Sequence, residues 1–312
     1  MAVYRDGVEW IWARVLACTV VAGAVLAEAP ARHGSIKCVG GDSATTAESV
    51  STQIASAGLV LDFDARHGVE LDENGRVLSW KNRAANSPIQ VLQTQPRGRE
   101  VADSGRPTLM RSSESAQPAA WLRFAQQELV SADEDALDDL LRGQGSTWLT
   151  QLAVFQQRVG LPDVNAFWGT LKNGSLYEGL WAGVTDDNRL WWGPRNGLSF
   201  GRVDANNPWL MGPKLTEKVW HVVAGRIAAG TGEVKVELFV DSPQPVVTAQ
   251  WPVNPKANAS KFAIGQERDA VEHPGKESFD GDIARFLLYS RPLSDEELRV
   301  AMGVLTSAMN KK

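Results

Sequence analysis

Short apolar or alternating runs recur from Gly58 onward, and each one is closed by Gly, Asn, Asp or Pro. Such runs are typical of β-strands joined by turns, because these four residue types suit the turn backbone. Neither a repeat of fixed period nor an alternation of strands with long helices is visible, so a doubly wound α/β sheet is disfavoured. Fourteen runs qualify as strands: residues 59–65, 76–82, 89–93, 120–125, 147–157, 165–171, 176–184, 189–193, 198–203, 218–227, 232–242, 246–251, 261–267 and 281–290.

The run at residues 232–242 shows how these strands meet a core. Apolar residues alternate with charged ones, and only Phe239 breaks the pattern. This alternation gives the strand one apolar and one solvent-exposed face, which predicts an antiparallel sheet with one face packed on the core. Residues 220–227 and 283–289 are apolar on both faces and should be central strands. The pattern as a whole predicts an all-β fold, a β-sandwich of two antiparallel sheets rather than a small barrel.

Two segments have helical periodicity instead. Residues 131–143 begin with acidic side chains and end at a glycine, which predicts a short internal helix. Near the C-terminus, Ser294 and Glu297 have the spacing of a capping box, so a helix should begin there. Its apolar face should pack on the sandwich and consists of Leu298, Ala301, Met302, Leu305 and Met309.

The N-terminal residues 1–27 predict an export signal. The basic side chains Arg5 and Arg14 precede an apolar stretch at residues 15–27, and small residues suit cleavage near Ala27 or Ala29. The stretch is shorter than the roughly 20 apolar residues that a membrane span needs, which favours cleavage over a retained anchor. We therefore expect a secreted protein, extracellular or periplasmic, with no membrane span in the mature chain.

Residues 28–57 are rich in Ala, Ser, Thr and Gly and predict a flexible linker before a domain at residues 58–309. Cleavage of the signal would leave Cys38 as the one cysteine, and a single thiol forms no internal disulfide. The formal charge is −5 and no basic run occurs. This balance argues against nucleic acid as a partner, because phosphate binding needs clustered Lys and Arg.

The C-terminal third resembles the closing strand and helix of laminin G-like, concanavalin A-like jelly-roll domains of secreted bacterial proteins. In that pattern an F-x-G-x-I-A strand leads to a Tyr and then to an R-x-L-S-x-x-E helix start. Upstream, residues 218–226 and 236–242 resemble the W-H-V-x-A strand and the L-Y-V-D-G hairpin, although Ser242 stands where the family has Gly. The resemblance extends over residues 58–308. The C-terminal matches are Phe279, Gly281, Ile283, Ala284, Tyr289, Arg291, Leu293, Ser294 and Glu297.

The resemblance implies a two-sheet jelly-roll sandwich. Members of the family bind carbohydrate or protein partners, some bind one Ca²⁺ at the sandwich rim, and some relatives of the wider fold are glycoside hydrolases. Hydrolysis needs two carboxylates across a groove. The E-x-D-x-E run that such enzymes present on one strand is absent. Glu237 and Asp241 share a strand face, but a solvated outer face accounts for them equally well, so no enzyme is predicted.

Residues 197–201 match the G-x-S-x-G pattern of serine hydrolases, with Ser199 at its centre. That mechanism requires a helix after the serine, and the following residues contain Pro208 and have no helical periodicity. His221 lies in an apolar strand, where a packed histidine is the usual case. We therefore interpret Ser199 as an ordinary strand residue.

The adjacent tryptophans Trp191 and Trp192 are the least ordinary feature of the chain. Successive side chains of a strand point to opposite faces, so one indole should face the core. The other should line the outer sheet surface or be covered by a loop. An exposed indole beside polar side chains suits a sugar ring. The candidate ligand site is Trp181, Trp191, Trp192, Arg195 and Asn196, with Pro194–Gly197 as a turn between two strands.

Calcium is the one cofactor for which the sequence offers candidates. Asp186, Asp187 and Asp204 supply oxygen ligands, although turns favour the same residues. The sequence thus predicts a secreted, non-catalytic recognition module that binds a glycan through aromatic side chains. The alternatives are a module that binds an extracellular protein or has a structural role at the cell surface, and, third, a glycoside hydrolase or lyase.

Overall fold

The computed structural model describes residues 53–94, 105–114, 117–157, 165–201, 203–267 and 278–309. The predicted signal peptide, and the predicted linker up to residue 52, lie outside the described residues. The end of that linker packs on the fold: Ile54 and Ala55 contact an apolar cluster, and the Ala55 carbonyl accepts a hydrogen bond from the Tyr289 hydroxyl at 3.1 Å. The last residues of the predicted linker, just before Gly58, are therefore part of the packed fold.

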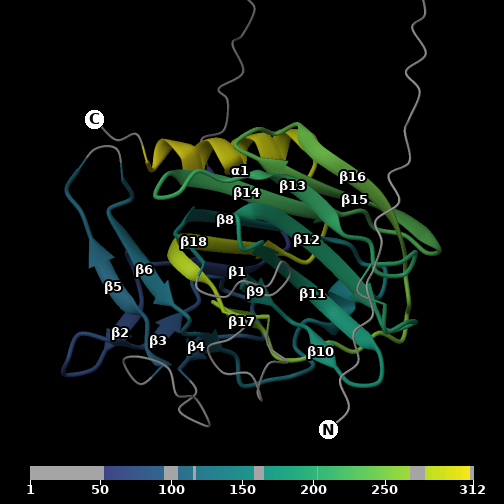
Figure 1. Cartoon of the computed structure of the whole chain (residues 1–312), viewed down its shortest axis with the longest axis horizontal. Helices are drawn as coiled ribbons and strands as arrows, with labels where there is room; N and C mark the ends of the chain where they lie inside the picture. The colour runs from purple at the N-terminus through teal and green to yellow at the C-terminus, as the bar shows by residue number, and fades with distance from the viewer. Residues whose placement is uncertain are drawn as a thin grey trace, which may run out of the picture. The chain divides into compact units, whose positions relative to one another are not determined.

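Two antiparallel sheets make up the fold, as predicted (Figure 1). The eight-stranded sheet has the order β16-β15-β14-β8-β18-β6-β5, and β1 pairs with β18 beyond the end of β6. Its strands are β1 (Leu59–Asp64), β5 (Thr108–Arg111), β6 (Ala120–Ala125), β8 (Ser146–Val154), β14 (Trp220–Ile227), β15 (Glu233–Val240), β16 (Pro245–Pro252) and β18 (Asp280–Tyr289).

The ten-stranded sheet has the order β13-β12-β11-β9-β17-β7-β4-β3-β2, and β10 pairs with β11. Its strands are β2 (Val69–Leu71), β3 (Val77–Lys81), β4 (Val91–Gln93), β7 (Leu129–Val130), β9 (Asn165–Gly169), β10 (Lys172–Asn173), β11 (Tyr177–Val184), β12 (Arg189–Asn196), β13 (Leu210–Lys214) and β17 (Ala263–Ile264).

The core between the sheets is rich in tryptophan. The Trp148 ring of β8 lies 5.4 Å from Trp168 of β9 and 5.7 Å from Trp192 of β12, measured between ring centroids. All three side chains are fully buried. Strands β14 and β18 are central, as their two apolar faces predicted, because each is paired on both sides.

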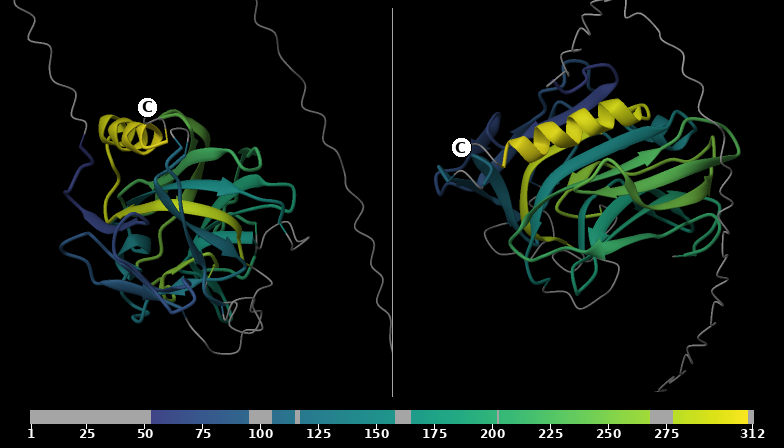
Figure 2. Two further views of the ribbon diagram at one scale, coloured as in Figure 1. Left: turned by 90° about the vertical axis from the view of Figure 1, so that its left-hand side faces the viewer. Right: turned by 90° about the horizontal axis from the view of Figure 1, so that it is seen from above.

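Helix α1 (Asp295–Ser307) explains why Phe239 breaks the alternation of β15. The predicted capping box is present, and the helix lies along the outer face of the eight-stranded sheet (Figure 2). Phe239 faces outward and is buried beneath the helix. The helix face consists of Leu298, Ala301, Met302, Leu305 and Met309, as predicted, and it contacts Leu149, Val222, Ala224, Leu287 and Tyr289.

Other predicted elements differ from the structure. The internal helix is reduced to a single 3₁₀ turn, η2 (Asp138–Leu141). Residues 198–201 and 203 form a loop, although a strand was predicted there. Short strands such as β2 and β10 were not predicted, because two or three residues are too few to show an alternating pattern. No helix among the described residues has the length and apolar character to cross a membrane.

Candidate functional site

The two adjacent tryptophans point to opposite faces of the ten-stranded sheet, as strand geometry requires. Trp192 joins the core, whereas Trp191 belongs to a separate cluster with Leu171, Tyr177 and Trp181. Both indoles have zero exposure. Of the two alternatives for the outward-facing indole, exposure on the sheet surface or cover by other residues, the structure shows the cover.

A cover built by the chain itself closes the outer face above Trp191. Trp181 lies 4.8 Å from Trp191 in an edge-to-face arrangement, and Trp209 lies 6.1 Å away on another side. Met211 of β13 packs on the same cluster. Trp209 itself is partly exposed, and we call Trp181 and Trp191 beneath it the covered tryptophans.

Arg195 and Asn196 are buried and serve the fold. The Arg195 guanidinium lies over the Trp181 ring at 5.3 Å and donates to the carbonyl oxygens of Pro194 and Pro208. Asn196 donates from its side-chain amide to the Pro252 carbonyl at 2.8 Å. These contacts join β12 to neighbouring loops. All five predicted ligand residues are buried, and Trp181 is the most exposed of them at 6%.

The predicted turn at Pro194–Gly197 is displaced, because β12 continues to Asn196. β13 pairs only with the first half of β12, up to Trp192, so Pro194 lies where one edge of the strand is unpaired. A proline is tolerated at such an edge because no ladder hydrogen bond is required of it there. The chain turns afterwards at Gly197, whose φ of 75° favours glycine.

The acidic residues proposed for calcium lie in two exposed turns. Asp187 accepts a hydrogen bond from Thr185 Oγ1, which lowers the pKa of that carboxyl. Asp204 accepts hydrogen bonds from the backbone of Asn206 and Asn207. No group of three or more His, Cys, Asp or Glu side chains suited to a metal occurs among the described residues. Calcium binding at Asp186, Asp187 and Asp204 stays a prediction.

The G-x-S-x-G segment is held as a loop. Ser199 Oγ donates to Asp204 at 2.8 Å and accepts from the Asn207 amide at 3.0 Å. Glu237 is engaged elsewhere, by Arg226 at 2.7 Å and Lys235 at 2.8 Å. These contacts account for Ser199 and Glu237 as structural groups.

An open hollow lies on the outer face of the eight-stranded sheet, past the C-terminal end of α1. It has a volume of about 840 Å³, and Thr306 of α1 and Met309, two residues past the end of the helix, form one wall. Its floor is a row of residues paired across four strands. The row consists of Arg123 of β6, Asp282 of β18, Ala153 of β8 and Trp220 of β14. We call this feature the sheet-face hollow.

A paired acid and base form the polar part of the sheet-face hollow. Arg123 donates to both carboxylate oxygens of Asp282, at 2.8 and 2.9 Å. Burial raises the pKa of the Asp282 carboxyl, against the opposing effect of Arg123, and the same ion pair raises the pKa of Arg123. The Arg123 side chain is 40% exposed and the Asp282 side chain only 5%, so the guanidinium is the more accessible partner.

Aromatic side chains surround this ion pair. The Trp121 and Trp220 rings meet edge to face at 5.7 Å and 72°, and the Arg123 guanidinium lies 5.0 Å from the Phe155 ring centre. Trp220 and Phe155 are partly exposed, whereas Trp121 is mostly buried. We call Trp121 and Trp220 the open pair. Apolar ring surface and polar groups therefore lie side by side within one hollow.

Comparison with protein families identifies the C-terminal part of the chain. Residues 165–299 match the model of Laminin_G_3, described as the concanavalin A-like lectin/glucanases superfamily. This laminin G-like region belongs to that superfamily. It supplies Trp220 and Asp282 to the sheet-face hollow, whereas Trp121, Arg123 and Phe155 precede it in the chain.

Several solved structures resemble this chain weakly. Trypanosoma rangeli sialidase in complex with sialic acid is 15% identical, with 78% of this chain and 32% of that chain covered and a TM-score of 0.48. The binding domain of Paraclostridial Mosquitocidal Protein 1 is 10% identical, with 78% and 52% covered and a TM-score of 0.49.

The binding domain of Botulinum neurotoxin DC in complex with SialylT is 9% identical, with 80% of this chain and 52% of that chain covered and a TM-score of 0.43. The chain thus spans about a third of the sialidase and about half of each binding domain. Among curated proteins, none matches the sequence.

Sequence reasoning missed the sheet-face hollow for a specific reason. Asp282 and Arg285 are three residues apart, yet both face outward, because a bulge at Ala284 adds one residue to β18. A strict period of two would place them on opposite faces. The sequence did offer one signal for the hollow: a tryptophan stands at or near the start of two strands, Trp121 in β6 and Trp220 in β14.

Proposed function

We propose that this protein is a non-catalytic carbohydrate-binding module and that the sheet-face hollow is its glycan site. The observation that carries the proposal is the partly exposed Trp220 indole beside the Arg123–Asp282 ion pair in one open hollow. A lectin-like sandwich fold supports it, since the superfamily description includes lectins.

The arrangement suits the two surfaces of a sugar. The apolar face of a pyranose ring packs on an indole, while its hydroxyls need directed donors and acceptors. Trp220 and Phe155 supply ring surface, and the half-exposed Arg123 guanidinium supplies N–H donors. An arginine already fixed by a bidentate ion pair loses little freedom when it binds a hydroxyl.

The charges of the hollow favour an uncharged glycan. Arg123 and Lys218 are balanced by Asp241 and Asp282 among its lining residues. Both carboxylates are held by protein donors: Asp282 by Arg123, and Asp241 by the Val222 amide at 2.8 Å and His221 Nδ1 at 2.6 Å. Carboxylates fixed by these bonds can accept a hydrogen bond from a ligand hydroxyl in a defined direction, which suits glycan binding.

The N-terminal pattern adds a proposal on location. A signal peptide at residues 1–27 would deliver the module to the periplasm or the cell exterior, where polysaccharides are accessible. N-terminal sequencing of protein recovered from culture medium or periplasm should find a start near Glu28 or Pro30, the residues that follow the two cleavage positions. Recovery of the intact N-terminus in membranes would contradict this part of the proposal.

The experiment is affinity electrophoresis of the purified protein against neutral polysaccharides, followed by calorimetry on those that retard it. Trp220→Ala should weaken binding about fivefold or more, because a ring–sugar contact contributes on the order of 1 kcal/mol or more. Phe200→Ala is the matched control: its ring is 53% exposed but lies in the loop after β12 and does not line the hollow. It should bind like the unchanged protein.

Four outcomes would contradict the proposal. Absence of binding to every polysaccharide, or equal binding by Trp220→Ala, removes the hollow as a glycan site. Capture of a defined extracellular protein by the same surface, without sugar, would support the protein-binding alternative. Release of reducing sugar that Asp241→Asn abolishes would support the hydrolase alternative.

A further inference from the structure

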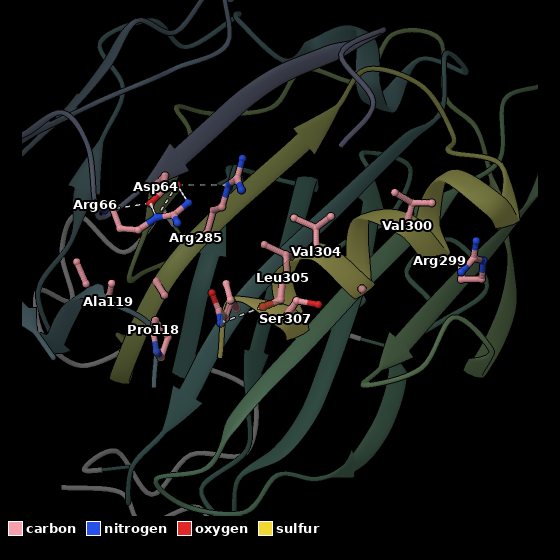
Figure 3. A pocket seen from close by; sticks show the side chains of 15 residues that line it. Asp64, Arg66, Pro118, Ala119, Arg285, Arg299, Val300, Val304, Leu305 and Ser307 are labelled. Atoms are coloured by element: carbon pink, nitrogen blue, oxygen red, sulfur yellow. Dashed lines mark hydrogen bonds and ion pairs between the residues drawn. The ribbon is translucent and has the colours of Figure 1, made fainter. Parts of the chain in front are cut away.

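A second cavity lies between α1 and the outer face of the eight-stranded sheet, separate from the sheet-face hollow. It has a volume of about 460 Å³, within the range of small-molecule pockets. Figure 3 shows Asp64, Arg66 and Arg285 together on one side of it and Val300 and Val304 of α1 on the other. We call it the helix-edge cavity.

The charged end of this cavity has a surplus of positive charge. Two carboxylates, Asp62 and Asp64, face three guanidinium groups, those of Arg66, Arg83 and Arg285. The bond to Arg66 lowers the pKa of Asp64 despite burial. Asp64 is 1% exposed and Asp62 is 6% exposed. One positive charge is therefore left without a counter-ion among the described residues of this cluster.

The arginines that line the cavity also keep unused donors. Arg66 binds Asp64 through Nε and Nη2, and Arg285 binds Asp62 through Nε and Nη2. Nη1 of each guanidinium has no partner among the described residues. Arginine pairs with carboxylates through such paired N–H groups, so two Nη1 donors at a cavity wall suit one more carboxylate.

The opposite wall is apolar and contains an unexplained glycine. Gly303 lies inside α1, where glycine costs roughly 1 kcal/mol relative to alanine. Its φ is not in the left-handed region, and an added Cβ would meet no atom within 4 Å. Neither backbone conformation nor close packing therefore requires it. Its effect is to leave space at the cavity wall between Val300 and Val304.

We propose that the helix-edge cavity binds a small amphipathic carboxylic acid. The carboxylate accepts hydrogen bonds from Nη1 of Arg66 and Arg285, and the aliphatic part lies along Val300, Gly303 and Val304. The site is independent of glycan binding, because it shares none of its lining residues with the sheet-face hollow.

Isothermal calorimetry with sodium hexanoate and sodium octanoate tests the proposal on the full folded protein. Octanoate should bind about fifteenfold more tightly than hexanoate, because each buried methylene contributes about 0.8 kcal/mol. Octanol and octylammonium have the same chain without the negative charge. Both should bind at least tenfold more weakly than octanoate, since a hydrogen bond to a charged group contributes about 1.5–3 kcal/mol.

Two variants separate the charged end from the apolar wall. Arg66→Gln should weaken octanoate about tenfold and leave octanol unchanged. Gly303→Leu should abolish binding of both, because the new side chain fills the cavity, while the helix gains in propensity and the protein stays folded. Gly174→Leu is the matched control: its added Cβ also meets nothing within 4 Å, its φ is likewise unstrained, and it lies outside the cavity.

Equal affinities for octanoate, octanol and octylammonium would overturn the proposal, because the arginines would then have no role. Unchanged octanoate binding by Gly303→Leu would overturn it as well, because the ligand would then lie elsewhere. Polysaccharide binding of Gly303→Leu, measured in parallel, should match that of the unchanged protein. Failure of the glycan site therefore remains distinguishable from failure of this one.

Discussion

The covered tryptophans and the open pair have the same ring geometry and opposite surroundings. Trp181 and Trp191 meet edge to face on the outer side of one sheet, and Trp121 and Trp220 do so on the outer side of the other. Trp181 and Trp191 lie beneath Trp209 and Met211, whereas Trp121 and Trp220 line an open hollow. An indole on the outer face of a sheet is therefore either open to a ligand or covered by other residues of the chain. Aromatic residues nearby in the sequence, such as Trp209 beside Trp191, favour the second case.

The largest expected effect is on folding free energy. Trp191→Ala removes a fully buried ring and should lower the free energy of unfolding by about 3–5 kcal/mol. Trp220→Ala should cost about 1–2 kcal/mol, because part of its ring is already in water. Urea denaturation followed by far-ultraviolet circular dichroism measures both. Equal losses would mean that the two groups do not differ in burial.

The next effect concerns the ion pair on the floor of the sheet-face hollow. Arg123→Gln should destabilise the protein by about 1–2 kcal/mol at pH 7, less than for a fully buried pair because Arg123 is 40% exposed. The variant leaves the buried Asp282 carboxylate without its guanidinium. The cluster around the covered tryptophans includes no buried carboxylate. This loss of stability is therefore expected only at the open pair.

The pH dependence of this variant follows from the sign of the Asp282 shift. Burial already raises the pKa of Asp282 above 3.8, and loss of Arg123 should raise it further. At pH values between 3.8, the ordinary pKa of the carboxyl in the unfolded chain, and the raised pKa in the folded protein, the folded state binds more protons than the unfolded state. The stability of the protein therefore falls as pH rises through that interval. The deficit of Arg123→Gln, measured by urea titration, should shrink towards pH 4. A deficit independent of pH would show that Asp282 is not the group involved.

The smallest effect concerns the helix that forms a wall of the hollow. Arg291 and the Ser294 backbone lower the pKa of Glu297 to about 2. The resulting stability is present above pH 4.5 and is lost as pH falls from 4.5 towards 2. Because the Glu297 side chain is 32% exposed and its ion pair with Arg291 is partly screened by water, Glu297→Gln should cost only about 1 kcal/mol near pH 7. Thermal unfolding at pH 7 and pH 3 measures the change, and Glu296→Gln is a control outside the capping box.

Local rules predicted the parts of the fold that depend on one strand or one helix. Ser294 and Glu297 set the start of α1, and alternation placed Trp191 and Trp192 on opposite faces. These features need only neighbouring residues. The cover over Trp191 could not be predicted in the same way, because Trp209 reaches it through a loop whose path depends on hydrogen bonds from Asn207.

The sheet-face hollow escaped prediction because its residues meet only through sheet pairing. Arg123 and Asp282 are 159 positions apart and become neighbours when β6 pairs with β18. A sequence shows which residues alternate, but the register that brings two distant strands together is set by the whole core. Arg195 shows the converse error, since its surroundings of Trp, Gly and Asn resemble a surface and it is 2% exposed.

Because of the bulge at Ala284, both cavities depend on the number of residues in β18 as well as on their identity. On one side of this residue Asp282 faces the sheet-face hollow, and on the other Arg285 faces the helix-edge cavity. Deletion of Ala284 would restore a strict alternation, and either Asp282 or Arg285 would then turn towards the tryptophan core. The strand can therefore vary its side chains one at a time, but a change of one residue in length would remove one of the two cavities.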